Sequence, residues 1–248
     1  MFLKLKTTNF NFHKTFNSGL FYLFYEPEPT RKMIIGGKLI TLKFKQTGNQ
    51  LIISCSEEIE KDQKTRLINR IKYCLDLEED LSEFYNICKK DLVLKNHLEK
   101  IKDTRVISAF SDFEALVGAI ISQNNSYRNY RIQMRRVYKN LNFIRENYTE
   151  KNLLKLKLGY KINYLLDLVE NFEKTKLRDI KGIGNYSINL FNIFQKRDYN
   201  YFYMDCLTEK IMRENYKIKE NFEEASIKLW GKYRGLAEAY LQKFFEVK

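Results

Sequence analysis

The chain of 248 residues is long enough for one large domain or two small ones, and its 44% hydrophobic content excludes a disordered chain. Lysine and arginine exceed aspartate and glutamate by 44 to 31, so the net charge is +13, which favours polyanionic partners. The sequence contains no apolar run of about 18 residues, so no membrane-spanning helix is expected. Four scattered cysteines and two distant histidines argue against a zinc site or an iron–sulfur cluster.

The first part of the chain is predicted to form strands. Residues 32–44 and 50–56 are rich in Ile, Leu and Phe, and glycine-containing turns break them. This spacing is typical of an antiparallel meander. We therefore expect an N-terminal antiparallel β domain over residues 1–56.

Residues 57–248 are predicted to be helical. The period changes at Glu57, where apolar residues begin to recur on one helical face. They are Ile59, Leu67, Ile68, Ile71 and Leu75. Both prolines lie earlier in the chain, so the long segments beyond them can be helical.

One helix start is well marked. Ser111 and Glu114 form the S-x-x-E pattern of a capping box, and residues 115–121 then read as a buried helix. The apolar run stops at four polar residues, 123–126. Because a buried helix end leaves polar groups that need partners, we expect these residues to be held by hydrogen bonds.

A Gly-x-Gly turn at Gly182 and Gly184 lies between two helical patterns, within residues 177–194. Glycines let the backbone turn sharply and leave amides uncovered by side chains. Exposed amides at a helix N-terminus attract phosphate, so the turn can hold a DNA backbone. Taken alone, the turn also fits an ordinary interhelical loop.

Asp205 follows an aromatic stretch and opens a predicted helix. It is therefore a candidate helix N-cap. In a partly dry cleft, the same carboxylate can stabilise a sugar cation and orient a water molecule against it. The two roles are compatible, because an N-cap holds a side chain still.

These motifs resemble the helix–hairpin–helix DNA glycosylases of base-excision repair. The family pattern L-P-G-[VI]-G followed by V-D is similar to residues 180–184 and to Met204-Asp205. Four further segments resemble the 8-oxoguanine glycosylase branch, and the chain is also similar to 3-methyladenine DNA glycosylase II. The segments are residues 16–24, 111–126, 158–165 and 229–241. The resemblance implies an α+β fold, in which an N-terminal antiparallel sheet domain precedes a two-lobed helical glycosylase core with a helix–hairpin–helix motif.

The resemblance also implies roles for single residues. Asp205 is the expected catalytic carboxylate. DNA contacts are expected from three places. They are the hairpin, the residues that fill the gap left in the DNA when the damaged base flips out, and a wedge beside the base that has lost its pairing partner. These are Gly182, Gly184, Asn185, Tyr186, Ser187, Asn124, Asn125, Tyr160 and Lys161. The base pocket is expected to contain Gly19, whose carbonyl would read the N7 proton of 8-oxoguanine, with Leu207, Glu238 and Gln242.

Three departures from the family pattern bear on the chemistry. Tyr186 stands where bifunctional members carry the lysine that forms a Schiff base, and a phenol cannot form one. We therefore expect a monofunctional glycosylase, in which Asp205 activates water. Leu207 replaces a histidine, and Glu238 replaces the glutamine that reads the base. A carboxylate near the base favours a donor-rich or cationic substrate, such as an alkylated purine. The expected substrate is therefore a damaged purine, alkylated or oxidised.

Three alternatives remain at the sequence level. The chain could be a non-catalytic DNA-binding module, a bifunctional 8-oxoguanine glycosylase/lyase that uses another amine, with Lys181 as first candidate, or an RNA-binding protein, for which no motif is found. We expect an intracellular monomer, cytoplasmic or associated with the nucleoid, that acts on double-stranded DNA containing a damaged base. No cofactor is expected beyond a monovalent cation that the hairpin can hold.

Overall fold

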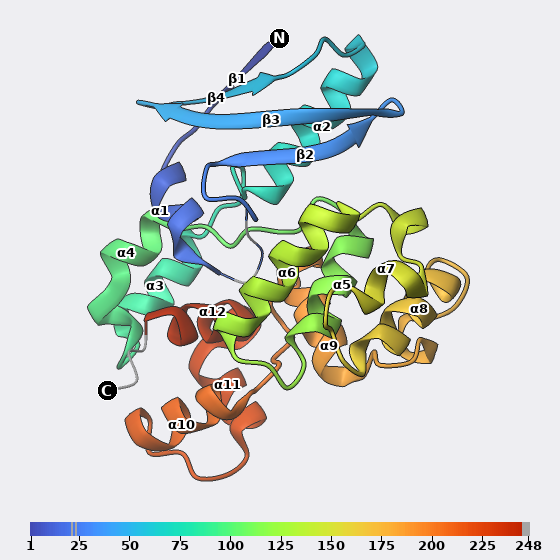
Figure 1. The fold of residues 1–248 in the computed structure, drawn as a ribbon. Coiled ribbons are helices and arrows are strands. Elements are labelled where there is room, and N and C mark those ends of the chain that lie inside the picture. Colours follow the sequence, from blue (N-terminus) through green and yellow to red (C-terminus); the bar gives the residue numbers. More distant parts are fainter. Residues whose placement is uncertain (21, 23, 245–248) are drawn as a thin grey trace.

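A four-stranded antiparallel sheet forms one end of the molecule (Figure 1). The computed structural model describes residues 1–20, 22 and 24–244. The strands are β1 (Phe2–Lys6), β2 (Thr30–Ile35), β3 (Lys38–Thr47) and β4 (Gln50–Cys55), in the order β1-β4-β3-β2. The expected meander is confirmed as β2-β3-β4, and β1 adds a strand beside β4.

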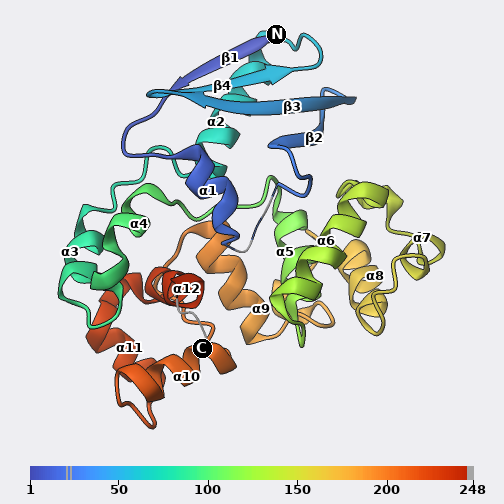
Figure 2. The ribbon, with the colours of Figure 1, turned by 60° about the vertical axis from the view of Figure 1, so that its left-hand side comes forward.

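Beyond the sheet, the described chain is mainly helical (Figures 1 and 2). The helices are α1 (Phe12–Ser18), α2 (Lys61–Cys74), α3 (Ser82–Lys90), α4 (Leu98–Asp103), α5 (Asp112–Ser122), α6 (Tyr127–Leu141), α7 (Glu150–Leu154), α8 (Lys161–Asn171), α9 (Asn185–Leu190), α10 (Cys206–Asn215), α11 (Phe222–Trp230) and α12 (Arg234–Phe244). Helices α5 to α8 form one lobe, and α3, α4 and α10 to α12 form the other, with α9 between them. The expected α+β fold with a two-lobed helical core is confirmed.

Helix α2 lies behind the strands of the sheet in Figure 1 and runs down towards the helical body. Its apolar face follows the predicted period, because Leu67, Ile71 and Leu75 are fully buried, while Ile59 and Ile68 pack at the edge. The helix begins later than residue 57, at an N-cap on Glu60. Buried residues of the sheet and of the helical body belong to one continuous cluster, and a domain division at residue 56 stays a prediction.

Helix α5 is the buried helix that the sequence predicts, but its capping box is half formed. The Ser111 hydroxyl accepts the N–H of Glu114 at 3.1 Å. The Glu114 side chain does not complete the box. It is 2% exposed, forms an ion pair with Arg31 of β2 and accepts the hydroxyl of Tyr25 at 2.8 Å. A buried arginine needs a counter-charge, and this need overrides the local cap.

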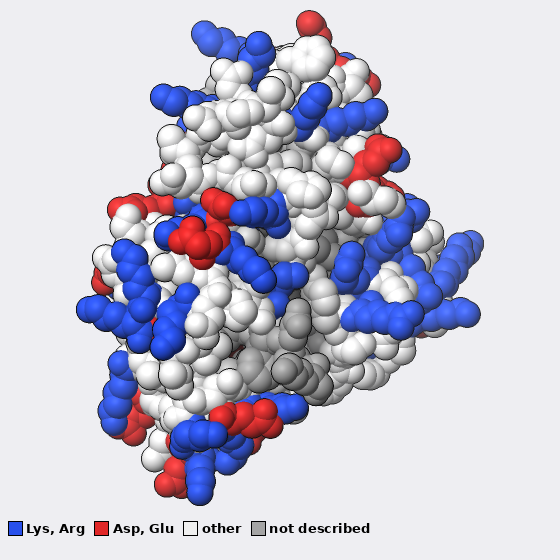
Figure 3. Space-filling view, turned by 90° about the vertical axis from the view of Figure 1, so that its left-hand side faces the viewer, with Lys and Arg blue, Asp and Glu red and all other residues white. Residues whose placement is uncertain are grey.

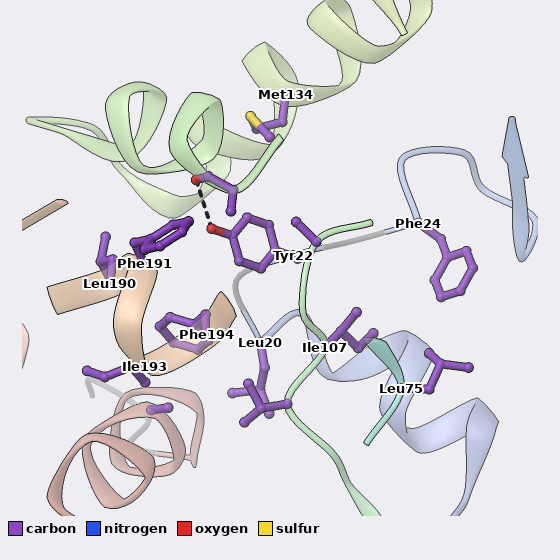
Figure 4. Packing of buried hydrophobic residues seen from close by; sticks show 14 of the residues in the cluster. Leu20, Tyr22, Phe24, Leu75, Ile107, Met134, Leu190, Phe191, Ile193 and Phe194 are labelled. Atoms are coloured by element: carbon purple, nitrogen blue, oxygen red, sulfur yellow. Dashed lines mark hydrogen bonds between the residues drawn. The ribbon is translucent and has the colours of Figure 1, made fainter. Parts of the chain in front are cut away.

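Tyr22 packs the N-terminal segment against α5, between the two lobes (Figure 4). Its hydroxyl donates to the carbonyl of Ala115 at 2.9 Å, and its ring meets Phe194 edge-on with centroids 6.4 Å apart. Gly118 makes room for this ring, because a Cβ there would lie 2.9 Å from the Tyr22 ring. Tyr22 is thereby held beside the helices that carry the candidate site.

Candidate active site

A cavity of about 380 Å³ lies where the two lobes meet. Helices α5, α6, α9, α10 and α12 and the end of α1 contribute to its wall. The lining residues are Ser18, Gly19, Leu20, Ser122, Asn125, Tyr127, Tyr130, Tyr186, Leu190, Phe194, Tyr203, Asp205, Leu207, Ala239, Gln242 and Lys243. The wall is largely aromatic and apolar, and Asp205 is the carboxylate among these residues. A planar aromatic ligand fits such a surface.

Asp205 is held still at the start of α10. Its Oδ1 accepts the N–H of Thr208 at 2.9 Å, so the predicted N-cap is observed. The residue before it, Met204, has a φ of +31°, which is rare for a residue with a side chain. The half-buried carboxylate of Asp205 thus sits at a sharp turn on the cavity wall.

Tyr186 faces the same cavity from α9. Its ring meets the ring of Tyr203 edge-on, with centroids 6.1 Å apart. The pKa of the Tyr186 phenol is raised to about 12. Burial is the main cause, a hydrogen bond with Ser122 opposes the rise, and the nearby carboxylates of Asp205 and Glu238 contribute to it. The phenol is therefore neutral at ordinary pH, and it is no nucleophile.

The hairpin is tied to the end of α5. Gly182 has a φ of +86°, and a Cβ there would collide with the ring of Tyr164. The side-chain amide of Gln123 donates to the Gly182 carbonyl at 2.6 Å and to the Ser187 hydroxyl at 2.8 Å. The polar end of α5 is thus held by hydrogen bonds to the hairpin, as expected from the sequence. Ser187 is fully buried, side chain and main chain alike, so it presents no surface to DNA in this structure. Gly184 and Asn185 are exposed at the start of α9.

The polar residues after α5 point in different directions. Asn124 is exposed with a φ of +46°, and its side-chain amide lies 3.3 Å from the Tyr160 hydroxyl. Tyr160 is half exposed. Asn125 instead turns inward, where its amide donates to Gln133 at 2.8 Å. Asn124 and Tyr160 thus form an exposed pair on the surface, and their entry into DNA stays a prediction.

Comparison with known proteins gives a consistent answer. Residues 2–116 match the family model of the 8-oxoguanine DNA glycosylase N-terminal domain. The chain has the fold of the 8-oxoguanine DNA glycosylases. MBOgg1 in complex with a low-affinity DNA ligand has a TM-score of 0.76 at 20% identity, with 98% of this chain and 94% of that chain covered. The predicted resemblance to this superfamily is confirmed.

Two further structures support the same fold. The 8-oxoguanine glycosylase/lyase of Clostridium acetobutylicum has a TM-score of 0.73 at 18% identity over 99% of both chains. The 3-methyladenine DNA glycosylase of Archaeoglobus fulgidus has a TM-score of 0.75 at 16% identity over the whole of both chains. No match to a curated protein sequence was found. These likenesses show that the chain shares the fold of both structures.

Glu238 does not take the expected position in the base pocket. It is fully buried, and it is not among the residues that line the cavity. Its carboxylate accepts the N–H of Tyr203 at 2.9 Å and the hydroxyl of Thr208 at 2.8 Å. Helix α12 turns this side chain towards the α10 start rather than towards the cavity, which Ala239 and Gln242 reach instead.

Lys161 is also placed differently from expectation. It is 4% exposed, and its ammonium donates to the Ile121 carbonyl at 2.7 Å. The last carbonyls of a helix lack partners within it, and a cation satisfies them well. Lys161 therefore caps the end of α5 and does not form part of a wedge beside Tyr160.

Gly19 lies in the cavity wall, but its carbonyl already has a partner. The hydroxyl of Tyr127, at the start of α6, donates to it. The expected reading of a base by this carbonyl would compete with that bond. The segment that suggested Gly19, residues 16–24, contains Phe21 and Leu23, which lie outside the described residues. Leu207 and Gln242 both line the cavity, as expected.

Lys243 is a cavity residue that sequence reasoning missed. It follows Gln242, and it lies four residues after Ala239 on the same face of α12. Burial lowers the pKa of its amine. The candidate amine named from sequence, Lys181, is exposed and not among the lining residues. The i, i+3, i+4 spacing of residues 239, 242 and 243 is the signal that could have found Lys243.

In the described part of the chain, no group of three His, Cys, Asp or Glu residues could hold a metal ion. None of the described helices is both long and apolar enough to cross a membrane. A monovalent cation at the hairpin stays a prediction.

Proposed function

We propose that the protein is a monofunctional DNA glycosylase that removes an alkylated purine from duplex DNA through a water molecule activated by Asp205. One observation carries the proposal: a carboxylate fixed by the N–H of Thr208 faces an aromatic cavity, and a neutral phenol, that of Tyr186, stands at the Schiff-base position of the resemblance. We further propose that it acts as a monomer, in the cytoplasm or on the nucleoid.

The reaction follows from the fixed carboxylate. As the bond between C1′ and the purine nitrogen breaks, positive charge grows on the sugar, and the negative charge of Asp205 stabilises it. Water then attacks C1′, and Asp205 accepts the water proton. The products are the free purine and an intact strand with an abasic sugar. A purine that already carries positive charge leaves as a neutral base, so its departure needs no proton donor.

The cavity wall favours an alkylated purine over 8-oxoguanine. Stacking against aromatic rings stabilises a cationic ring more than a neutral one. Two groups that could read a neutral base are already engaged. The Gly19 carbonyl accepts the Tyr127 hydroxyl, and the Gln242 amide accepts from Tyr203 at 2.6 Å and donates to Thr208 at 2.8 Å.

DNA binding is supported by charge and by the exposed turn residues. The net charge is +13, and Lys and Arg project from most parts of the face shown in Figure 3. The Clostridium acetobutylicum enzyme was also solved with double-stranded DNA. We propose that the amides between Gly182 and Asn185 hold a phosphate, and that Asn124 and Tyr160 fill the space left by the flipped base.

The hairpin proposal has a matched pair of variants. Gly182→Ala introduces a Cβ at a φ of +86°, against the Tyr164 ring, whereas a Cβ at Gly184 meets no atom within 4 Å. We expect Gly182→Ala to weaken affinity for an undamaged duplex at least tenfold, and Gly184→Ala to change it less than threefold. Fluorescence anisotropy at fixed salt measures both. Unchanged affinity in folded Gly182→Ala would place the phosphate elsewhere.

A panel of lesions tests the enzymatic proposal. Duplexes that contain 8-oxoguanine, 3-methyladenine, hypoxanthine or uracil are incubated with the protein and resolved with and without alkali. We expect cleavage of the alkylated duplex in the alkali lanes only. If no duplex yields an abasic site, the protein is not a glycosylase of these bases. Strand cleavage without alkali would contradict the monofunctional mechanism.

Lys243 supports a second candidate, a bifunctional glycosylase/lyase. The Lys243 amine lines the cavity, and burial lowers its pKa. Such an amine could attack C1′, displace the base as the bond from C1′ to the purine nitrogen breaks, and form a Schiff base with the opened sugar. Borohydride trapping with wild type, Lys243→Arg and Lys181→Arg separates the candidates. A trapped adduct that disappears in Lys243→Arg alone would establish Lys243 as the nucleophile. Absence of any adduct, which we expect, supports water as the nucleophile.

A further inference from the structure

A buried hydrogen-bonded cluster lies directly behind Asp205. Its members are Tyr203, Thr208, Glu238 and Gln242. Gln242 reaches the cavity, whereas the Glu238 carboxylate is sealed beneath it with no exposure. Complete burial of an acidic side chain has a large desolvation cost, so a specific role is expected for Glu238.

Glu238 grips the chain on both sides of Asp205. One oxygen, Oε2, accepts the N–H of Tyr203 at 2.9 Å, and the N–H of Met204 also donates to the carboxylate. The other oxygen, Oε1, accepts the hydroxyl of Thr208 at 2.8 Å. Thr208 in turn gives its own N–H to Asp205 Oδ1. The same carboxylate therefore fixes the residues before Asp205 and the residue that orients it.

The backbone at Met204 explains why such a grip is needed. A φ of +31° is unfavourable for a residue with a Cβ and persists only where the surroundings hold it. The bonds from Glu238 to the N–H groups of Tyr203 and Met204 hold this turn. Without them, the chain can relax, and a shift of about 1 Å in a catalytic group can cost about a hundredfold in rate.

We propose that Glu238 is a positioning residue for Asp205, which acts through the strained Met204 turn and through Thr208 rather than by contact with the base. This inference rests on the proposed function, because it assumes that Asp205 is the catalytic carboxylate.

Three variants test the proposal in single-turnover excision of the panel duplex on which wild type is most active. Glu238→Leu removes every bond of the carboxylate and should lower the rate about a hundredfold, while affinity for the duplex stays within threefold. Glu238→Gln keeps an acceptor oxygen for the two N–H groups and should restore the rate to within about tenfold of wild type. Thr208→Val keeps the N–H to Asp205 but removes the hydroxyl, and we expect an intermediate loss.

Tyr240→Phe is the matched control on the same helix. Tyr240 is buried and donates its hydroxyl to Thr104, on the side of α12 away from Asp205. The variant removes a buried hydrogen bond and should leave the excision rate unchanged. A similar rate loss in Tyr240→Phe would show that general loosening of α12, and not positioning, explains the Glu238 variants.

The outcomes separate this inference from the proposed function. If wild type cleaves no duplex of the panel, the proposed function fails. If wild type is active and folded Glu238→Leu excises at nearly the wild-type rate, the positioning role is wrong and the proposed function stands. If Glu238→Leu does not fold, Thr208→Val carries the test, and an unchanged rate there contradicts the proposal.

Discussion

Two buried glutamates solve the same physical problem differently in two regions of the molecule. Glu114, between the sheet and α5, is neutralised by the guanidinium of Arg31, which lies about 5 Å from the centroids of four aromatic rings. Glu238, behind the cavity, is held by neutral donors, the N–H of Tyr203 and the hydroxyl of Thr208. Burial raises its pKa to about 8, and the charge of Asp205 adds to the rise.

The difference indicates that Glu114 serves the stability of the fold, whereas Glu238 serves the candidate active site. The ion pair between Arg31 of the sheet and Glu114 of α5 joins two parts of the fold, and each of its charges neutralises the other. A glutamate without a cation beside it is close to neutral at pH 7, so it can grip the Asp205 turn without placing a full second charge next to the catalytic carboxylate. The first glutamate should therefore matter for stability, and the second for rate.

Breaking the first pair should give the largest change in stability. Arg31→Met leaves Glu114 buried without its counter-charge and should reduce the free energy of unfolding by about 3–5 kcal/mol. Urea denaturation measures the loss. The excision rate per folded molecule should stay near that of wild type. The double variant with Glu114→Leu should recover much of the stability, and a double variant as unstable as Arg31→Met would mean that the ring cluster, not the charge, is what matters.

The pH dependence of stability should report the second glutamate. An ordinary glutamate has a pKa of 4.5, whereas Glu238 keeps its proton in the folded state up to about pH 8. Between these values the native chain binds more protons than the unfolded chain, so the contribution of Glu238 to stability falls as pH rises through this window. Glu238→Gln does not titrate.

We therefore expect the free energy of unfolding to fall less steeply from pH 5 to pH 8 in Glu238→Gln than in wild type. Urea midpoints at several pH values give the comparison, with Tyr240→Phe as a control that keeps the wild-type slope. Parallel curves for wild type and Glu238→Gln would show that Glu238 is already ionised in the folded protein.

Removing a neutral group that donates to Glu114 should have the smallest effect on the free energy of unfolding. Tyr25→Phe deletes the hydroxyl that donates to Glu114 at 2.8 Å and leaves the ion pair with Arg31 in place. The expected cost is about 1–2 kcal/mol of unfolding free energy, with no change in excision rate. A loss as large as that of Arg31→Met would erase the distinction between the ion pair and its surrounding hydrogen bonds.

Local patterns could be predicted from the sequence, and long-range pairings could not. The N-caps at Ser111 and Asp205 need only a hydroxyl or carboxylate a few residues before its donor, so they were predictable. Glu114 fits a capping box equally well, but its partner Arg31 lies 83 residues away in sequence. Only the folded chain shows that the ion pair takes this side chain out of the box.

The candidate site shows the same limit. Its expected catalytic carboxylate and Tyr186 were named from local motifs, and both line the cavity. The directions of Lys161 and Glu238 depend on helix rotation, which places neighbouring positions of one helix in opposite environments. A family resemblance assigns a role to a position in the sequence. The side chain at that position can nevertheless point into the interior, as those of Lys161 and Glu238 do.

The most direct measurement is the single-turnover excision rate of Asp205→Asn on the panel duplex that wild type cleaves best. Asparagine also accepts the N–H of Thr208 as an N-cap, so the helix and the cavity should persist. We predict a rate about 10²–10⁴-fold below wild type, with unchanged DNA affinity and melting temperature. A folded, DNA-binding Asp205→Asn protein that excises the base within tenfold of the wild-type rate would contradict the account.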